Sequence, residues 1–227
     1  MVKFRWVDRR GRWKVKEIRI YIEGGGDYKN TKKLIKEGFA RFLQPIADTA
    51  SSPKIKWDII IGGTYNHAFR DFKNAFKSYA DTFDLSFLDG ETPVKINSPW
   101  EHLKARDNWD EPVVVDDHNC HLILQTMEAW FIADIATLKK FYRQDFKENS
   151  IPKNANVEII SKDILEPTLK TATGSTTKGE YHKIKHAYKL LELLDVAKVC
   201  QASPYCDHLF TISVSKRTGL INDTERK

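Results

Sequence analysis

The stretch Glu17-Ile18-Arg19-Ile20-Tyr21-Ile22-Glu23-Gly24-Gly25-Gly26-Asp27 sets the class of the fold. Its first six residues alternate and are rich in β-formers, which predicts a strand over 17–22. The strand ends abruptly at three glycines, which adopt backbone angles that other residues resist. Apolar side chains then recur at helical spacing over 31–43, and Asn30 is the expected N-cap.

The same order of strand and then helix returns along the chain. A second strand is predicted over 55–61, followed by Gly62-Gly63 and a helix over 67–79. A third strand over 84–88 ends in Asp89-Gly90-Glu91. Strands that alternate with helices of this length indicate βαβ units. The predicted fold is therefore α/β, a Rossmann-like, mainly parallel sheet of about four strands flanked by helices, with a helical C-terminal extension.

The second half of the chain predicts fewer strands and more helices. Residues 92–119 read as irregular, 121–124 as a fourth strand, and 126–142 as the best-marked later helix. Shorter helices are expected over 163–171 and 181–194, and no strong signal follows Phe210. The expected division is a basic hairpin or arm (1–17), an α/β core (18–135), a helical extension (136–210) and a tail (211–227).

Composition limits the class of protein. The chain has 227 residues, of which 41% are hydrophobic, so it can bury a sizeable core. No apolar run approaches the roughly 20 residues of a membrane helix, and the basic start lacks the apolar stretch of a secretory signal. We therefore expect a cytoplasmic protein without a membrane partner. Its three cysteines are too few and too scattered for a disulfide framework, and its sequence leaves homo-oligomers open.

The N-terminal arm concentrates positive charge. Arg9, Arg10 and Arg12 lie there between Trp6 and Trp13, and the whole chain has a formal net charge of +6. A basic arm that bears aromatic residues suits a nucleic-acid backbone. The alternative is a solvated edge hairpin whose two tryptophans pack inward.

Carboxylates stand at two predicted strand ends. Glu23 and Asp27 follow the first strand, and Asp89 and Glu91 follow the third. Ligands of open parallel sheets bind at the carboxyl ends of the strands, and adjacent strands are about 4.8 Å apart. Carboxylates without nearby histidine or cysteine suit Mg²⁺ or Mn²⁺. The alternatives are a phosphate-binding glycine turn, whose G-x-G-x-x-G spacing is not met, and an ordinary Asp-Gly turn.

These motifs resemble the Toprim domain of primases, topoisomerases and OLD-family nucleases. That domain has Glu-Gly at the end of its first strand and an Asp-x-Asp-type pair at the end of a later one, where this chain has Glu91 as the second acid. The whole chain is also similar, over about residues 18–205, to an uncharacterised prokaryotic family with Toprim-like motifs. The similar stretches are Tyr21-Ile22-Glu23-Gly24-Gly25-Gly26-Asp27, Pro99-Trp100-Glu101-His102-Leu103, Cys120-His121-Leu122-Ile123-Leu124-Gln125-Thr126-Met127-Glu128-Ala129-Trp130-Phe131 and Lys178-Gly179-x-Tyr181-x-Lys183-x-x-His186.

The resemblance implies a role for each acid. Glu23, Asp89 and Glu91 would hold a first Mg²⁺ or Mn²⁺, and Asp27 would join them or bind a second ion. Glu128 would be a second-metal ligand or a general base. Its alternative is an ordinary helix glutamate, but its apolar surroundings predict a carboxylate that is paired or liganding.

Three basic residues follow in a polar loop and the helix after it. Lys178, Lys183 and His186 could hold a phosphate, and Lys183 could stabilise the charge that develops in phosphoryl transfer. Lys183 and His186 are three residues apart and would share a helix face. The alternative is an ordinary helix face that is exposed to solvent. Trp130 and Phe131 are predicted to belong to the core.

Together these expectations describe a metal-dependent phosphodiesterase, a nuclease acting on DNA or RNA. The resemblance to OLD-type proteins also implies anti-phage defence with a separate ABC-type ATPase, because this chain has no Walker A sequence. The main alternative is a non-catalytic module that binds a nucleic acid, a nucleotide or a partner protein. Nucleotidyl transfer, which uses the same carboxylate and metal chemistry, is a third reading.

Overall fold

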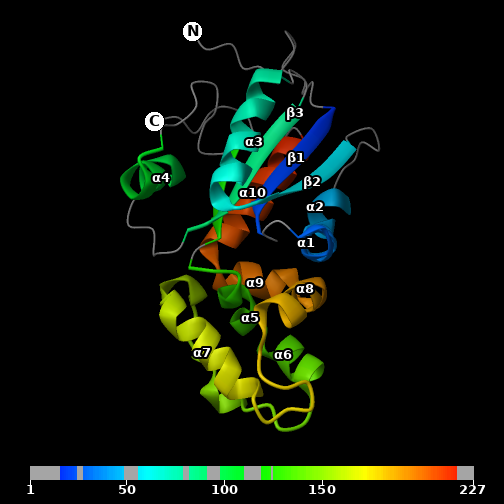
Figure 1. Ribbon diagram of the computed structural model, residues 1–227, viewed down its shortest axis with the longest axis vertical. Coiled ribbons are helices and arrows are strands. Elements are labelled where there is room, and N and C mark those ends of the chain that lie inside the picture. The colour runs from blue at the N-terminus through cyan, green and yellow to red at the C-terminus, as the bar shows by residue number, and fades with distance from the viewer. Residues whose placement is uncertain are drawn as a thin grey trace.

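The computed structural model describes residues 16–24, 28–48, 56–78, 82–90, 98–109, 119–123 and 125–218. This part of the chain forms a parallel sheet with helices on both faces, and a lobe of helices lies beyond the carboxyl ends of the strands (Figure 1). The α/β, Rossmann-like class predicted from the sequence is confirmed.

Within the described residues the sheet has four strands in the order β2-β1-β3-β4, and every pair is parallel. The chain adds β2 on one side of β1 and then β3 on the other side, so the direction in which strands are added changes between β1 and β3. In such a sheet this change of direction marks the crevice where ligands bind. The strands are β1 (Glu17–Glu23), β2 (Lys56–Gly63), β3 (Thr82–Asp89) and β4 (Cys120–Ile123).

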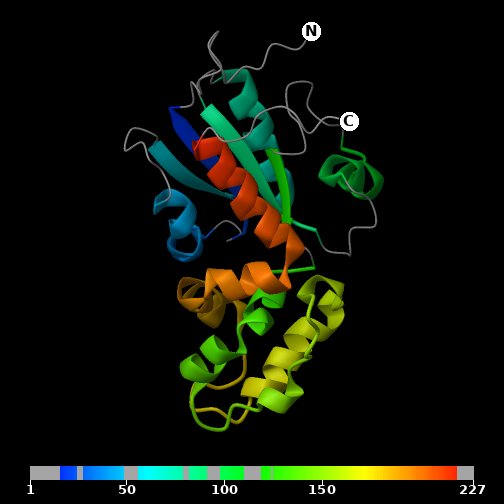
Figure 2. The ribbon, with the colours of Figure 1, turned by 180° about the vertical axis from the view of Figure 1, so that it is seen from behind.

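Helices α1 (Lys29–Phe42) and α3 (Tyr65–Ser78) cover opposite faces of the sheet. Phe39 of α1 packs its ring edge-on against Phe87 of β3, with centroids 5.7 Å apart. On the other face, Phe72 of α3 meets Tyr21 of β1 at 6.0 Å. Figure 1 shows α3 in front of the strands, and Figure 2, from behind, shows α10 across the far face.

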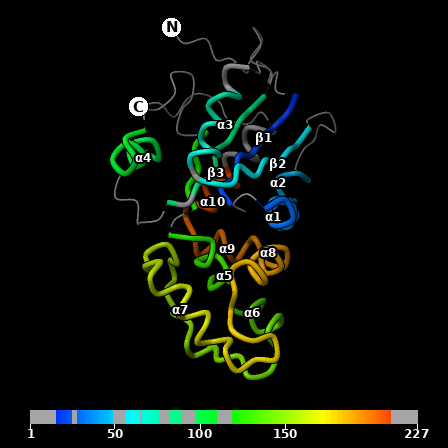
Figure 3. The backbone as a smooth tube through the Cα atoms, viewed as in Figure 1, coloured from blue at the N-terminus to red at the C-terminus, as the bar shows by residue number. Residues whose placement is uncertain are grey.

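The remaining helices divide between the sheet and the helical lobe. Figure 3 shows α5 to α9 gathered in the lobe, while α10 returns to the sheet. In the described residues no helix is both long and apolar enough to cross a membrane. The bounds are α2 (Gln44–Asp48), α4 (Pro99–Asp107), α5 (Glu128–Ala133), α6 (Ile135–Tyr142), α7 (Lys162–Thr173), α8 (Lys183–Leu193), α9 (Val196–Ala202) and α10 (Pro204–Thr218), with 3-10 turns η2 (Glu148–Ser150) and η3 (Val157–Ile159).

Helix α4 corrects the prediction that residues 92–119 are irregular throughout. The side chain of Ser98 accepts a hydrogen bond from the backbone N–H of Glu101, and Pro99 occupies the first turn. A capping serine followed by proline is a strong start signal for a helix. The neighbouring prolines and tryptophans hide this signal in the sequence.

The predicted helix over 126–142 is also wrong, because the structure divides it at Asp134. The carboxylate of Asp134 is fully buried and caps α6 by accepting from the N–H of Thr137. It also accepts from the N–H of Asp195 and from Lys198 Nζ, at 3.0 and 2.8 Å. These contacts fix a break that helical spacing alone does not reveal.

Two helix ends differ from the predictions. Tyr28, rather than Asn30, is the N-cap of α1, and its side chain makes no capping hydrogen bond. The stretch after Phe210, which carries no strong sequence signal, continues α10 as far as Thr218. Phe210 packs its ring against Phe42 of α1 at 5.7 Å, so α10 is anchored to the core.

Candidate functional site

Glu23 and Asp89 end two neighbouring strands at the same edge of the sheet. The last residue pair between β1 and β3 is Ile22 with Phe87, and the two acids follow it on either side. The condition for the predicted carboxylates to converge, that β1 and β3 be adjacent, is met. Asp27, Glu91 and the side chain of Asp89 lie outside the described residues.

Gly24 turns the chain immediately after Glu23. Its φ of 143° lies in a region that favours glycine, and its N–H donates to the carbonyl of Gly63 at 2.8 Å. The pairing of β1 with β2 is irregular between Ile22 and Glu23. The backbone therefore requires glycine after Glu23. The turn that Gly24 makes leaves Glu23 at the rim of a pocket.

The turn after Asp89 is fixed by two hydrogen bonds to Gly90. The N–H of Gly90 donates to the carbonyl of Ile123 at 2.7 Å, which ties β3 to β4. The carbonyl of Gly90 lies 3.1 Å from Nε2 of buried His102, so this nitrogen carries the proton and donates. The sequence alone gives His102 no role, although this histidine belongs to the Pro99–Leu103 motif.

A pocket of about 390 Å³ opens at this edge of the sheet, between α1 and α8. Its rim carries Glu23 and Gly24 at the end of β1 and Ile123 at the end of β4, the strands that flank β3. Lys183 and the exposed Tyr28 also line it. The walls are mainly apolar and comprise Thr31, Ile35, Phe39, Ala187, Tyr188 and Leu191, with Met127 and Ile184.

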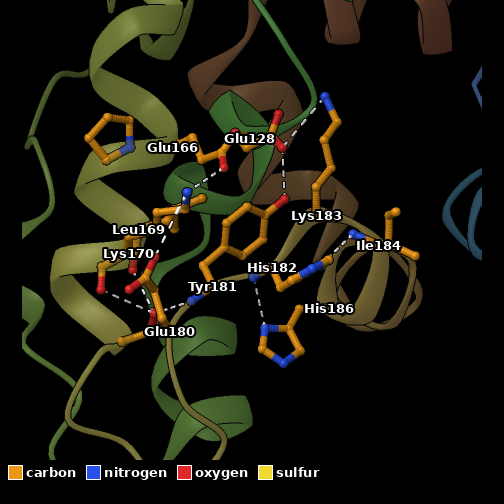
Figure 4. A network of polar contacts seen from close by, with 12 residues as sticks. Glu128, Glu166, Leu169, Lys170, Glu180, Tyr181, His182, Lys183, Ile184 and His186 are labelled. Atoms are coloured by element: carbon orange, nitrogen blue, oxygen red, sulfur yellow. Dashed lines mark hydrogen bonds and ion pairs between the residues drawn. The ribbon is translucent and has the colours of Figure 1, made fainter.

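Glu128 lies beside Lys183, which lines the pocket (Figure 4). Its side chain is 2% exposed, and its Oε1 accepts a hydrogen bond of 2.7 Å from the phenol of Tyr181. Nζ of Lys183 is 3.8 Å from the same oxygen, and Oε2 is buried without a hydrogen-bond partner. Burial and then Glu128 raise the pKa of Tyr181, so the phenol stays protonated and donates. Of the two roles predicted for Glu128, paired or liganding, the structure shows the pairing, with Tyr181 and Lys183.

Two neighbours in the sequence position Glu128. Trp130 is 1% exposed, stacks on Phe42 of α1 at 4.9 Å and packs against Phe87 of β3 at 5.5 Å, which anchors α5 to the sheet. Gln125 has a φ of 63°, accepts from the N–H of Lys162 and donates to the carbonyl of Glu158. The residues around Glu128 thus hold its carboxylate where the helical lobe meets the α/β sheet. Phe131 is also buried, as predicted.

Lys183 and His186 point away from each other, so the predicted shared face does not bring them together (Figure 4). Nδ1 of His186 accepts a hydrogen bond from the backbone N–H of His182 at 3.2 Å, so this nitrogen carries no proton. The hydroxyl of Tyr142 therefore donates to the same Nδ1, at 3.0 Å. Burial first, then the charges of His182 and nearby lysines, lower the pKa of His186. Within the described residues these contacts give His186 a packing role.

Lys178 also lies apart from the pocket. Its Nζ sits over the ring of Phe141, 4.7 Å from the centroid. With Lys140 and Arg143 it lines a second concavity of about 280 Å³ in the helical lobe. Arg9, Arg10 and Arg12 lie outside the described residues.

The metal prediction rests on carboxylates that the structure describes only in part. Among the described residues, no three side chains of His, Cys, Asp or Glu form a group that could hold a metal ion. The described residues include Glu23 but not Asp27 or Glu91, which the sequence assigns to the same ion. Oxygen donors alone would suit a hard divalent cation.

The fold and this site define a parallel α/β domain with a pocket at the carboxyl ends of its strands. A family model described as a domain of unknown function (DUF4276) matches residues 22–212, and the chain belongs to that family. This confirms the expectation of an uncharacterised family. Neither the curated proteins nor the solved structures contain a match.

Proposed function

We propose that this protein is a Mg²⁺- or Mn²⁺-dependent phosphodiesterase that cleaves nucleic acid. The observation that carries the proposal is the adjacency of β1 and β3, which end in Glu23 and Asp89 at one edge of the sheet. This arrangement agrees with the Toprim-like motifs of the sequence. The position of the pocket at the same edge adds a place for substrate.

Glu23, Asp89 and Glu91 would hold the ion, with Asp27 beside them. A bound divalent cation supplies an activated water and stabilises the charged oxygens of the transferring phosphate. Lys183 reaches the pocket from α8 and would bind a substrate phosphate. Glu128, held by Tyr181, lies 3.8 Å from Lys183 and would position that lysine electrostatically. Glu128 is thus better suited to positioning than to acting as a base.

Lys178 and the arginines of the arm would add phosphate contacts outside the pocket. Lys178, Lys140 and Arg143 form a basic concavity that a nucleic-acid backbone could follow. The resemblance to OLD-type proteins supports a setting in anti-phage defence and a separate ABC-type ATPase as partner.

The test is cleavage of plasmid DNA, circular single-stranded DNA and total tRNA with Mn²⁺, with Mg²⁺ and with EDTA. We expect cleavage with a metal only, and its loss in Glu23→Gln and in Asp89→Asn. Glu192→Gln and Asp207→Asn, at exposed positions on α8 and α10, are the matched controls and should cleave at the wild-type rate. Cleavage that survives EDTA, or equal rates in all four variants, would reject the proposed mechanism.

A second candidate is a non-catalytic nucleotide-binding module. The observation that favours it is the mainly apolar lining of the pocket, in which Glu23 is the only acid among the described residues. If no substrate is cleaved with either metal while nucleotides still bind the pocket, this second function is the correct one.

A further inference from the structure

The pocket between α1 and α8 has the size and lining of a small-molecule site. Its volume of about 390 Å³ lies within the roughly 300–1,000 Å³ of typical ligand pockets. Gly38 brings the two helices together, because a Cβ there would lie 3.0 Å from the carbonyl oxygen of Tyr188. The pocket is therefore built by close helix packing at the strand ends, and the close approach keeps its walls in place.

Two exposed apolar side chains mark the mouth of this pocket. Tyr28 is 78% exposed and Ile184 is 59% exposed, although both line the pocket. Tyr28 caps α1 only through its backbone, so its ring has no capping role. An exposed aromatic ring beside an apolar pocket suits stacking with a flat, aromatic ligand.

The charges at the rim define the rest of the ligand. Of the described residues that line the pocket, Lys183 carries the one cationic side chain and Glu23 the one anionic side chain. Nζ of Lys183 lies 3.8 Å from Glu128, farther than a hydrogen bond reaches, so this buried carboxylate attracts the ammonium group without a direct hydrogen bond. A ligand with an apolar flat body and a phosphate matches this combination of walls and rim.

We infer that the pocket receives the base of an unpaired nucleotide, with its phosphate at Lys183 and its base against Tyr28 and the walls of α1 and α8. This inference rests on the proposed function and names its substrate class. A base stacked within a duplex cannot enter a pocket of this kind without leaving the stack. The preferred substrate is therefore single-stranded DNA or RNA, or an unpaired end or loop.

The first experiment measures binding in EDTA, so that it does not depend on metal or cleavage. Adenosine, guanosine, cytidine and uridine 5′-monophosphates and their deoxy forms are titrated into the protein by calorimetry, with ribose 5-phosphate as the ligand without a base. We expect at least one nucleotide to bind about ten-fold or more tightly than ribose 5-phosphate. A labelled single strand should likewise bind more tightly than a duplex of the same sequence.

Matched variants locate the binding. Tyr28→Ala should weaken nucleotide binding about 5- to 150-fold, the range expected when one base no longer stacks on an aromatic ring. Ile184→Ser should weaken it, whereas Ile164→Ser, at a similarly exposed isoleucine on α7, should not. Lys183→Ala should weaken nucleotide and ribose 5-phosphate alike, and exposed Lys185→Ala on the same helix should weaken neither.

The outcomes separate this inference from the proposed function. Equal affinity for nucleotides and ribose 5-phosphate, equal affinity for single strand and duplex, or an unchanged affinity in Tyr28→Ala overturns the base pocket, even if metal-dependent cleavage is found. Base-dependent binding without cleavage supports the pocket and rejects the nuclease. Binding of a protein partner that Ile184→Ser abolishes, without nucleotide binding, would overturn the base pocket and assign it to that partner.

Discussion

The phenol of Tyr181 donates a hydrogen bond of 2.7 Å to the buried carboxylate of Glu128, 53 residues earlier in the chain. The contact joins the start of α5 to the segment that leads into α8, the helix that forms one wall of the pocket. Because Oε2 of Glu128 has no hydrogen-bond partner, the Tyr181 phenol is the only hydrogen-bond donor to this carboxylate among the described side chains.

Tyr181→Phe should therefore destabilise the protein. Removing the phenol leaves the buried carboxylate of Glu128 without its hydrogen-bond donor, which costs about 1–3 kcal/mol or more for a charged group. Urea unfolding monitored by circular dichroism measures the change in stability. Tyr188→Phe is the control, because its hydroxyl makes no hydrogen bond within the described residues, and it should unfold near the wild-type midpoint. Equal midpoints for the two variants would contradict the assigned role.

The sheet could be predicted from the sequence because its signals are local. Alternating strands that end in glycine, and helices between them, predict parallel pairing without any knowledge of distant contacts. The start signal of α4, Ser98 followed by Pro99, is also local, but the neighbouring prolines and tryptophans hide it and the helix is not predicted. Local rules therefore cover most of the α/β core.

The break at Asp134 and the partner of Glu128 could not be predicted in this way. Asp134 is held by groups 61 and 64 residues later in the chain, and Tyr181 is 53 residues from Glu128. The sequence predicts that a glutamate in apolar surroundings needs a partner, but only the packing of the helical lobe selects which one. The pocket depends on the same packing of α8 against α1.

If Asp89 binds the metal, His102→Ala should impair cleavage, because His102 holds the turn that follows Asp89. Without the imidazole, the carbonyl of Gly90 has one hydrogen bond fewer, and the turn that follows Asp89 loosens. Removal of a group that orients a metal ligand typically costs about 10–100-fold in metal affinity or activity. The measurement is the Mn²⁺ concentration for half-maximal cleavage, which should rise. His102→Gln, which keeps an N–H donor, should recover part of the activity, and no difference between the two variants would argue against positioning.

Gly62→Ala should destabilise the fold through steric overlap. A Cβ at this position would lie 2.4 Å from the Cα of Ala68, so α3 would have to move away from β2. Overpacking of this kind costs about 1–3 kcal/mol. Gly174→Ala is the control, because its φ of −58° suits alanine, and we expect a change below about 1 kcal/mol. Thermal and urea unfolding should give the same order, and wild-type stability in Gly62→Ala would show that the two elements separate freely.

Neutralising the arm should flatten the salt dependence of nucleic-acid binding. If Arg9, Arg10 and Arg12 bind phosphates, replacing all three with glutamine reduces the number of counterions released on binding. The slope of log K against log salt should then decrease by about 0.7–0.9 for each phosphate that the arm no longer neutralises. Fluorescence anisotropy with a labelled single strand measures the slope for the wild type and for the triple variant. An unchanged slope would assign the arm to the alternative reading, a structural hairpin.

Acid should weaken the fold through His186. Its pKa in the folded protein lies below the ordinary 6.5, because burial and nearby positive charge disfavour the imidazolium. The unfolded chain therefore binds more protons near neutrality, and the stability contributed by neutral His186 is complete above pH 6.5 and disappears as the pH falls through the folded pKa. Protonation also removes the acceptor that the Tyr142 phenol and the His182 N–H share.

The measurement for His186 is the free energy of unfolding in urea at pH values of about 7.5 and about 5, on either side of the ordinary histidine pKa. Asparagine presents an oxygen acceptor and does not titrate in this range, so His186→Asn should lose less stability between the two pH values than the wild type. His67→Asn, at an exposed histidine on α3, should follow the wild type and controls for the substitution itself. The same carboxylates titrate in all three proteins, so their contribution to the free energy of unfolding cancels when the variants are compared at each pH. If His186→Asn loses as much stability as the wild type, the acid sensitivity arises elsewhere, and the link between His186 and Tyr142 does not depend on a neutral imidazole.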